Sequence, residues 1–241
     1  MRKYLICLPF AVLIVACGGG GGETAKTSQD CFNEGFWGSG SRISISVNYS
    51  SNFGVSYQED ETYAVVDSYV EGGEIYATVS EPRFVQSRFS LGNGYLKEYG
   101  YSGGKPPFVS AREITPPKVF PVSMDIGQTV HQSYFVTVKS NGPSGPSQDA
   151  WDAHESRTYV GREVIKTSLG AFEACQFKIK ENLNASSGAA SSFSDEKTVW
   201  IAAGGSYRGL VLKTETVRSP LNGARSTTSK EVVKVNVFNV N

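Results

Sequence analysis

The main pattern along the chain is an alternation of apolar and polar residues with a period of two. In residues 42–49, apolar Ile43, Ile45, Val47 and Tyr49 alternate with polar side chains. Such alternation predicts a β-strand with one buried face. The same criterion predicts ten further strands, at residues 62–70, 74–80, 83–91, 95–101, 132–139, 157–166, 171–180, 197–202, 209–219 and 227–238.

Several of these segments are joined by short glycine-containing turns, at Gly72-Gly73, at Asn93-Gly94 and around Gly223. Glycine accepts the positive φ angles of tight hairpins, so neighbouring strands are expected to be antiparallel. Residues 147–156 are the one stretch where a helical turn is plausible. About eleven strands and little helix predict an all-β antiparallel fold.

Five prolines interrupt the alternation between residues 105 and 121. Proline lacks the N–H donor that a sheet requires, so a long central strand is not expected to cross this region. The segment is interpreted as a crossing loop or an edge segment within a single β domain at residues 31–241. The alternative is a linker between two small β modules.

The N-terminus has the features of a secretory signal. Basic residues Arg2 and Lys3 precede an apolar run at residues 4–15, which ends at Ala16-Cys17. The run has roughly a dozen residues, whereas a membrane-spanning helix needs about 20. Residues 1–16 are therefore expected to be a signal peptide.

Residues 13–17, Leu-Ile-Val-Ala-Cys, resemble the bacterial lipobox, in which the cysteine is lipidated and becomes the first residue. The resemblance implies a lipid on Cys17 and a membrane anchor through it. The alternative is an ordinary signal peptide with a cysteine near its end. Gly18 stands where lipoproteins of the inner membrane usually carry aspartate, which implies the outer membrane, facing the periplasm. Residues 17–30, rich in glycine, serine and threonine, are expected to be a flexible leash.

Charge gives no sign of a nucleic-acid partner. The chain has 23 basic and 23 acidic residues, and removal of residues 1–16 leaves a small acidic excess. Without a basic cluster, neither nucleic acid nor an anionic lipid surface is an expected partner.

After processing, Cys31 and Cys175 are the two cysteines left besides the lipidated one. In an oxidising compartment they are expected to form one disulfide. The alternative is two free thiols, because Cys175, Phe177 and Ile179 alternate on one face of a strand and Cys175 can be a small core residue.

Catalytic and metal-binding motifs are not found, so neither an enzyme nor a cofactor or metal site is expected. His131 and His154 are interpreted as surface or hydrogen-bonded histidines. The acidic runs Glu59-Asp60-Glu61 and Asp195-Glu196 are interpreted as solvated turns rather than cation sites.

Aromatic residues are the remaining candidates for function. Phe32, Phe36 and Trp37 follow the leash, and Tyr95, Tyr99 and Tyr101 form a second group. Such side chains can line a ligand cavity or a partner surface, or they can simply fill a β core.

The second half of the chain resembles a loosely defined set of uncharacterised bacterial envelope lipoproteins. The resemblance covers roughly residues 117–241 and rests on segments 120–129, 159–163, 167–175, 198–202 and 209–213. It implies a half-open β-barrel or strongly curved sheet, similar in outline to lipoprotein-localisation factors, and it brings no catalytic residue. Gly170 suits a turn, Phe172 a core position and Trp200 a barrel wall.

Two functions are consistent with these features. The first is a tethered module that binds or carries an apolar envelope ligand, which requires a sizeable apolar cavity. The second is a structural or interaction lipoprotein with a filled core, which docks to an envelope protein through an exposed sheet edge or patch.

Overall fold

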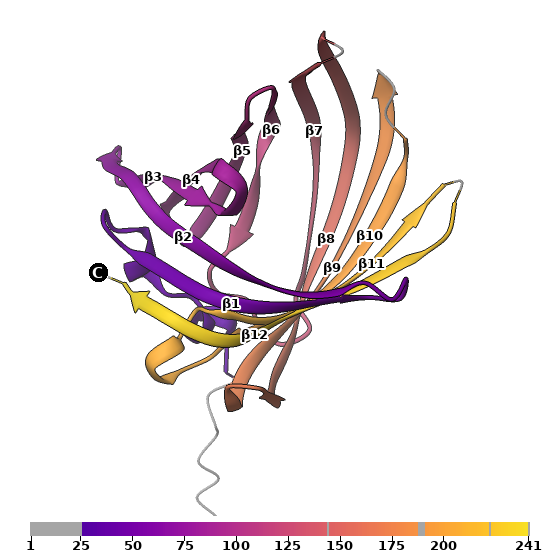
Figure 1. Ribbon diagram of the computed structural model, residues 1–241. Coiled ribbons are helices and arrows are strands. Elements are labelled where there is room, and N and C mark those ends of the chain that lie inside the picture. Colours follow the sequence, from indigo (N-terminus) through magenta and orange to yellow (C-terminus); the bar gives the residue numbers. More distant parts are fainter. Residues whose placement is uncertain (1–25, 144, 188–190, 222, 241) are drawn as a thin grey trace, which may run out of the picture.

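The alternating segments form twelve antiparallel strands that close into one barrel (Figure 1). The computed structural model describes residues 26–143, 145–187, 191–221 and 223–240. The expected signal peptide, Cys17 and the leash up to residue 25 lie outside the described residues. The strands are β1 (Arg42–Ser51), β2 (Ser56–Glu71), β3 (Glu74–Glu81), β4 (Val85–Gly92), β5 (Tyr95–Lys105), β6 (Phe108–Pro121), β7 (Thr129–Gly142), β8 (Gly145–Thr167), β9 (Gly170–Ser187), β10 (Phe193–Ala202), β11 (Val211–Pro220) and β12 (Ser226–Asn239).

Each strand pairs with its neighbours in the sequence, and β1 pairs with both β2 and β12. The expected all-β antiparallel fold with little helix is confirmed. The barrel is closed rather than half-open, and it has one strand more than the eleven expected. In Figure 1, β1, β2 and β12 run across the view in front of the lower part of the upright strands β7–β10.

The additional strand is β6, which runs through the proline-rich segment. Its pairing with β7 ends at Thr115, directly before Pro116 and Pro117, and its pairing with β5 shifts register in the same region. The N–H of Val119 is instead satisfied by the side-chain oxygen of Gln132, at 2.8 Å. The expectation of a loop was wrong because the prolines occupy an interruption of the ladder, where no donor is required.

The expected helical turn at residues 147–156 was also wrong. These residues are part of β8, where Trp151 lies opposite Val136 of β7, and Ala153 lies between Tyr134 of β7 and Leu183 of β9. Pairing on both sides of the strand outweighs the weak local preference for a turn.

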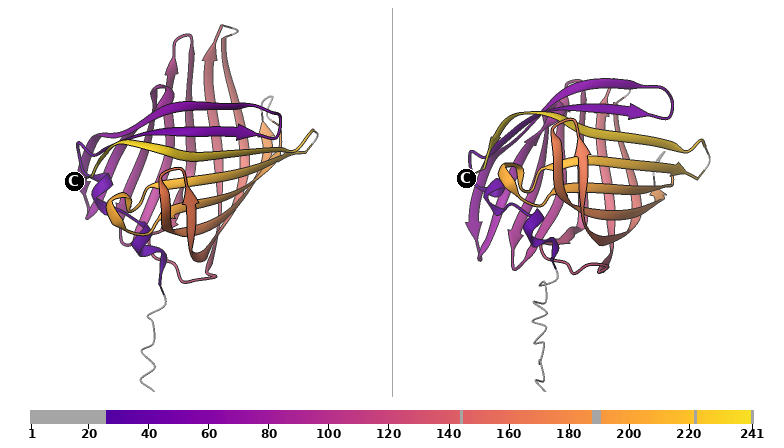
Figure 2. Two further views of the ribbon diagram at one scale, coloured as in Figure 1. Left: turned by 60° about the horizontal axis from the view of Figure 1, so that its bottom comes forward. Right: turned by 90° about the horizontal axis from the view of Figure 1, so that it is seen from below.

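The chain enters the barrel through two short 3₁₀ helices, η1 (Ser28–Cys31) and η2 (Glu34–Trp37), which cross its lower end (Figure 2). Each begins with a side-chain cap: Thr27 accepts the N–H of Gln29, and Asn33 accepts the N–H of Gly35. These caps satisfy donors that the first turn leaves free.

Residues 26–30 were expected to belong to the leash, but they contact the barrel. The buried hydroxyl of Ser28 donates to the carbonyl of Val122 and accepts the N–H of Met124, at 3.1 and 2.8 Å. Asp30 forms an ion pair with Arg162 of β8. Residues 26–30 are therefore part of the folded domain and not of a free leash.

The core at this end combines the barrel wall with the entering segment. A barrel of twelve strands is wider than wall side chains alone readily fill. Trp37 of η2 is buried against Phe89, with ring centroids 5.1 Å apart, and stands edge-on to Phe36. Among the described residues, no helix has the length and apolar character needed to cross a membrane.

Candidate functional site

The candidate site lies where two neighbouring strands of the barrel separate. The ladder between β11 and β12 extends from the pair Arg218 and Ser226 to the pair Lys213 and Glu231. Beyond Glu231, β12 continues as far as Asn239 and pairs there with β1. The wall between β11 and β12 is therefore not closed by backbone hydrogen bonds at this end of the barrel.

A cavity of about 380 Å³ occupies this place. It lies between the entering N-terminal segment and the strands on either side of the separation. Its volume falls within the range of roughly 300–1,000 Å³ that is typical of small-molecule sites. The lining is predominantly apolar and includes Phe32, Phe36, Trp37, Ile43, Ile45, Leu96, Ile201, Leu210, Val211, Leu212, Val232, Phe238 and Val240.

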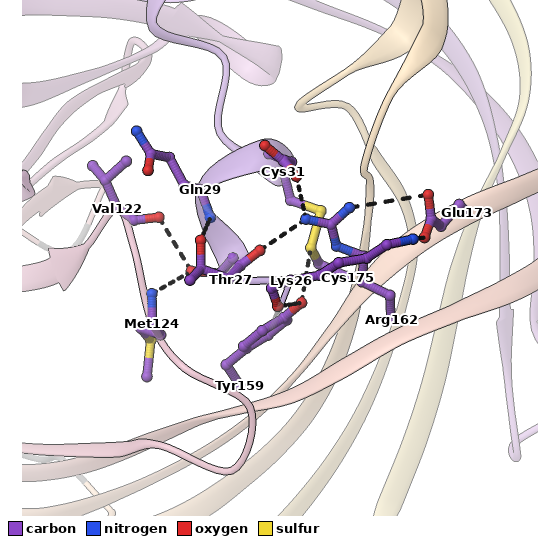
Figure 3. The surroundings of a disulfide bond; sticks show 12 residues. Lys26, Thr27, Gln29, Cys31, Val122, Met124, Tyr159, Arg162, Glu173 and Cys175 are labelled. Carbon is purple, nitrogen blue, oxygen red and sulfur yellow. Dashed lines mark hydrogen bonds and ion pairs between the residues drawn. A yellow bond between two sulfur atoms is a disulfide. The ribbon is translucent and has the colours of Figure 1, made fainter. Parts of the chain in front are cut away.

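The N-terminal wall of the cavity is fixed covalently. Cys31, which lines the cavity, is bonded to Cys175 of β9, 144 residues away, with Cα atoms 6.1 Å apart (Figure 3). Cys175 is fully buried and packs with Tyr159 and Phe177. In the chain-entropy treatment, a bridge over a loop of this length stabilises the fold by up to about 5 kcal/mol.

Arg162 adds a polar attachment beside the disulfide. Its guanidinium donates to the carbonyl of Thr27 at 2.9 Å and to the carboxylate of Asp30 (Figure 3). Lys26 pairs with Glu173 of β9 at 2.8 Å. The segment that forms one side of the cavity is thus held to β8 and β9 by one covalent bond and by these polar contacts.

One end of the lining is polar and is built from β1, β2 and β12. Glu61 is 3% exposed, and its carboxylate accepts hydrogen bonds from Tyr49 at 2.5 Å, Tyr63 at 2.7 Å and Lys230 at 2.5 Å. Lys230 also donates to the hydroxyl of Tyr63 at 3.2 Å. Lys230, Tyr63 and Thr214 line the cavity.

The titration behaviour of this group follows from its contacts. Burial alone would raise the pKa of Glu61, but hydrogen bonds from Lys230, Tyr49 and Tyr63 outweigh it and lower the pKa. Burial and the adjacent Glu61 carboxylate raise the pKa of both tyrosines. The carboxylate is therefore ionised and the phenols are neutral donors at neutral pH.

The outer side of β10–β12 is covered by the tip of the β8–β9 hairpin. The N–H and hydroxyl of Ser168 both donate to the carboxylate of Glu231, at 3.0 and 3.2 Å. Trp200 donates to Glu163 at 2.6 Å, and Phe172 packs against Tyr207 of η4 (Gly205–Tyr207). Figure 2 shows this hairpin lying across β10–β12.

A second polar cluster lies among the strands β6–β9. Lys118 contacts two buried carboxylates, Glu181 at 2.8 Å and Glu155 at 3.4 Å. Tyr134 donates to both of them, and Gln132 donates to Glu155 at 3.1 Å. Burial would raise the pKa of Glu181, but Lys118 and Tyr134 outweigh it and lower the pKa to about 2. Because its members satisfy one another, we interpret this cluster as structural.

The acidic runs were placed wrongly by the sequence interpretation. Glu59-Asp60-Glu61 belongs to β2 rather than to a turn, and Glu61 is buried. Asp195 is also buried, in β10, and forms two hydrogen bonds of 2.8 Å with Arg218. In both cases a basic partner makes burial of the carboxylate possible: Lys230 of β12 for Glu61 and Arg218 of the adjacent β11 for Asp195.

The two histidines lie close together on adjacent strands, β7 and β8, without forming a site. His154 forms a 2.9 Å hydrogen bond with Ser133, and the contact is exposed. His131 is one of the residues around a shallow polar depression on the same wall. Within the described ranges, no group of three or more histidine, cysteine or acidic residues is arranged to hold a metal ion.

The two aromatic groups that the sequence indicates lie in different parts of the barrel. Phe32, Phe36 and Trp37 all line the cavity. Tyr95 is 44% exposed, and Tyr99 bonds to Ser90 on the wall formed by β4 and β5. Only the first group belongs to the candidate site.

The sequence interpretation did not identify Lys230, Tyr63 or Glu61 as site residues. A signal was present, because Glu61 and Tyr63 share the phase of Val65, which is buried in the same strand. A charged residue in the apolar phase of a strand indicates a buried partner, and here that partner lies on β12.

The chain matches no known protein family and no curated protein. Among solved structures, it resembles a candidate lipoprotein from Parabacteroides distasonis, with 10% identity and a TM-score of 0.44 over 83% of this chain and 96% of that one. It also resembles an exported protein from Bacteroides fragilis with a YmcC-like fold, with 11% identity and a TM-score of 0.43 over 83% of this chain and 97% of that one. The similarity to the hypothetical lipoprotein YmcC from Escherichia coli is 9% identity and a TM-score of 0.34, over 79% of this chain and 84% of that one.

The chain resembles bacterial lipoproteins and exported proteins. TM-scores below 0.5 establish neither a shared family nor a shared function, so the function has to be inferred from the residues of this chain.

Proposed function

We propose that this protein is a lipid-anchored envelope protein that binds an apolar ligand in the cavity between η1–η2 and strands β11 and β12. The observation that carries the proposal is the largely apolar lining of about 380 Å³ at a place where the barrel wall is not closed by hydrogen bonds. A protein whose role is purely structural has no need to keep such a space open, because cavities reduce stability.

The N-terminal sequence supports the anchored part of the proposal. Lipidation of Cys17 attaches the protein to a membrane, and Gly18 favours the outer membrane with the domain facing the periplasm. An apolar ligand in that compartment has to be kept away from water between membranes.

Binding fits the lining better than catalysis does. Of the side chains around the cavity, Lys230 is engaged with Glu61, and Cys31 is bonded to Cys175. Neither supplies a free nucleophile with an adjacent base, which covalent catalysis requires. Closure of β1 onto β12 also leaves β1 paired on both edges, which makes docking through a sheet edge there less favourable.

The proposal is tested by filling the cavity. Val211 lines it and is 40% exposed, so Val211→Trp places a large side chain into the space without disturbing a tightly buried position. The mature chain from residue 17 onward, carrying Cys17→Ser, is titrated with the uncharged fluorescent probe N-phenyl-1-naphthylamine. Saturable binding to the otherwise unmodified protein and at least about tenfold weaker binding to Val211→Trp are expected.

Val237→Trp is the matched control, because Val237 is 41% exposed on β12 and does not line the cavity. Its affinity for the probe should equal that of the parent protein. Failure of the parent to bind the probe, or equal affinity in Val211→Trp, would reject the cavity as an apolar binding site and favour the interaction alternative.

A further inference from the structure

The polar end of the cavity has a hydrogen-bonding capacity that the protein does not use. A lysine ammonium has three N–H donors. Lys230 directs two of them, to Glu61 and to the hydroxyl of Tyr63. The third finds no acceptor among the described residues, and the Lys230 side chain lines the cavity. A ligand in this space therefore meets a charged donor of Lys230 beside a mostly apolar lining.

The polar groups around Lys230 already contact one another. The carboxylate of Glu61 receives hydrogen bonds from Tyr49, Tyr63 and Lys230. Both tyrosines use their protons for Glu61, so they are not available as donors. The third N–H of Lys230 is thus the donor left for a ligand, and it is complementary to a group that accepts a hydrogen bond.

The local charge excludes an anionic group at this end. Lys230 is already neutralised by Glu61 at 2.5 Å, and Glu81 of β3 is close enough to interact electrostatically with both residues. A ligand carboxylate would bring a further negative charge beside Glu61 in a partly desolvated place, where repulsion between like charges is strong. An uncharged carbonyl accepts the same hydrogen bond without that repulsion.

Resting on the proposed function, we propose that the ligand is a neutral lipid with an apolar chain and an uncharged carbonyl group, as in an ester or amide, and that Lys230 binds this carbonyl. The chain lies along the apolar lining formed by residues such as Phe36, Ile45 and Leu212. The Tyr49–Glu61–Tyr63 contacts hold the ammonium in position, so Tyr49, Glu61 and Tyr63 are positioning residues.

The experiment compares three competitors of equal chain length against N-phenyl-1-naphthylamine: dodecane, methyl laurate and the laurate anion. We expect methyl laurate to bind at least about tenfold more tightly than either of the others, since a hydrogen bond to a charged donor is worth that factor or more. In Lys230→Met, methyl laurate and dodecane should compete equally.

Removal of Lys230 alone leaves Glu61 buried without a counter-charge and can impair folding. The double variant Lys230→Met/Glu61→Gln restores neutrality and should show the same loss of preference for the ester. Lys234→Met is the control, because Lys234 lies on the same strand, is exposed and does not line the cavity. It should keep the full preference.

The outcomes separate this inference from the proposed function. If the probe binds but the ester preference survives in the double variant, the role of Lys230 is wrong and the cavity stands. If laurate binds most tightly, the charge argument is wrong, and the exposed Arg208 at another part of the lining becomes the expected partner of an anionic head. If no competitor and no probe binds, the proposed function fails as well.

Discussion

At the scale of single residues, the barrel buries charges only in groups whose members compensate one another. Lys118 lies between Glu155 and Glu181, and Tyr134 donates to both carboxylates. Removal of one member leaves a buried charge without its partner, which costs more than the complete group contributes. The cluster therefore makes stability depend on the protonation of Glu181.

This dependence gives a prediction for Glu181. Its pKa in the folded protein is about 2, below its ordinary value of 4.5, so the unfolded chain binds the proton more readily than the folded one. The stabilisation is present above about pH 4.5 and is lost as the pH falls toward 2. In Glu181→Gln, the free energy of unfolding should fall less steeply between pH 5 and pH 3, as measured by urea denaturation.

Glu196→Gln is the control for that prediction, because Glu196 is exposed on the neighbouring strand and pairs with the equally exposed Lys180. Its acid dependence should match that of the parent protein. An unchanged slope in Glu181→Gln would show that other carboxylates cause the acid sensitivity.

At the scale of elements, the period of two in the sequence predicted the positions of eleven strands, because each has one face toward the core and one toward solvent. β6 was missed because its prolines were judged by their missing donors, whereas the structure places Pro116 and Pro117 where pairing with β7 has ended. The first half of β8 was missed because the fit of Trp151 and Ala153 depends on β7 and β9. In both segments, the strand conformation depends on pairing with neighbouring strands, which the local sequence does not reveal.

The same region gives a prediction about the β5–β6 pair. Gly100 has φ +123°, and a Cβ atom added there would lie 2.0 Å from the carbonyl oxygen of Arg112 on β6. The obstacle is backbone in a paired strand, so it cannot move aside easily. Gly100→Ala should lower the free energy of unfolding by at least about 2 kcal/mol, measured by urea denaturation.

Gly94→Ala separates the effect of the contact from that of the backbone angle. Gly94 also has a positive φ, +77°, but nothing lies within 4 Å of the position that its Cβ would take. A loss of about 1 kcal/mol is expected there. Equal losses at the two positions would contradict the close approach of β5 and β6.

At the scale of the whole molecule, the cavity could not be predicted because its lining comes from distant parts of the chain. Phe36, Tyr63 and Lys230 meet only after β1 pairs with β12 and the N-terminal segment crosses the lower end. The sequence did indicate the aromatic residues of that segment, and it offered the Cys31–Cys175 bond as one of two interpretations. Neither indicated that the residues would enclose a space rather than fill it.

The position of the anchor relative to the cavity gives the last prediction. Lys26, the first described residue, pairs with Glu173 on β9, and the segment that follows it forms a wall of the cavity. Lys26 lies nine positions after Cys17, so even a fully extended connection would keep the proposed lipid within about 30 Å of Lys26. Cys17→Ser should move the protein from the membrane fraction to the soluble fraction of the envelope, while its affinity for the apolar probe stays unchanged.

The double variant Cys31→Ser/Cys175→Ser is the control and should remain with the membrane, because it keeps Cys17. A Cys17→Ser protein that still sediments with membranes would show that the attachment lies elsewhere.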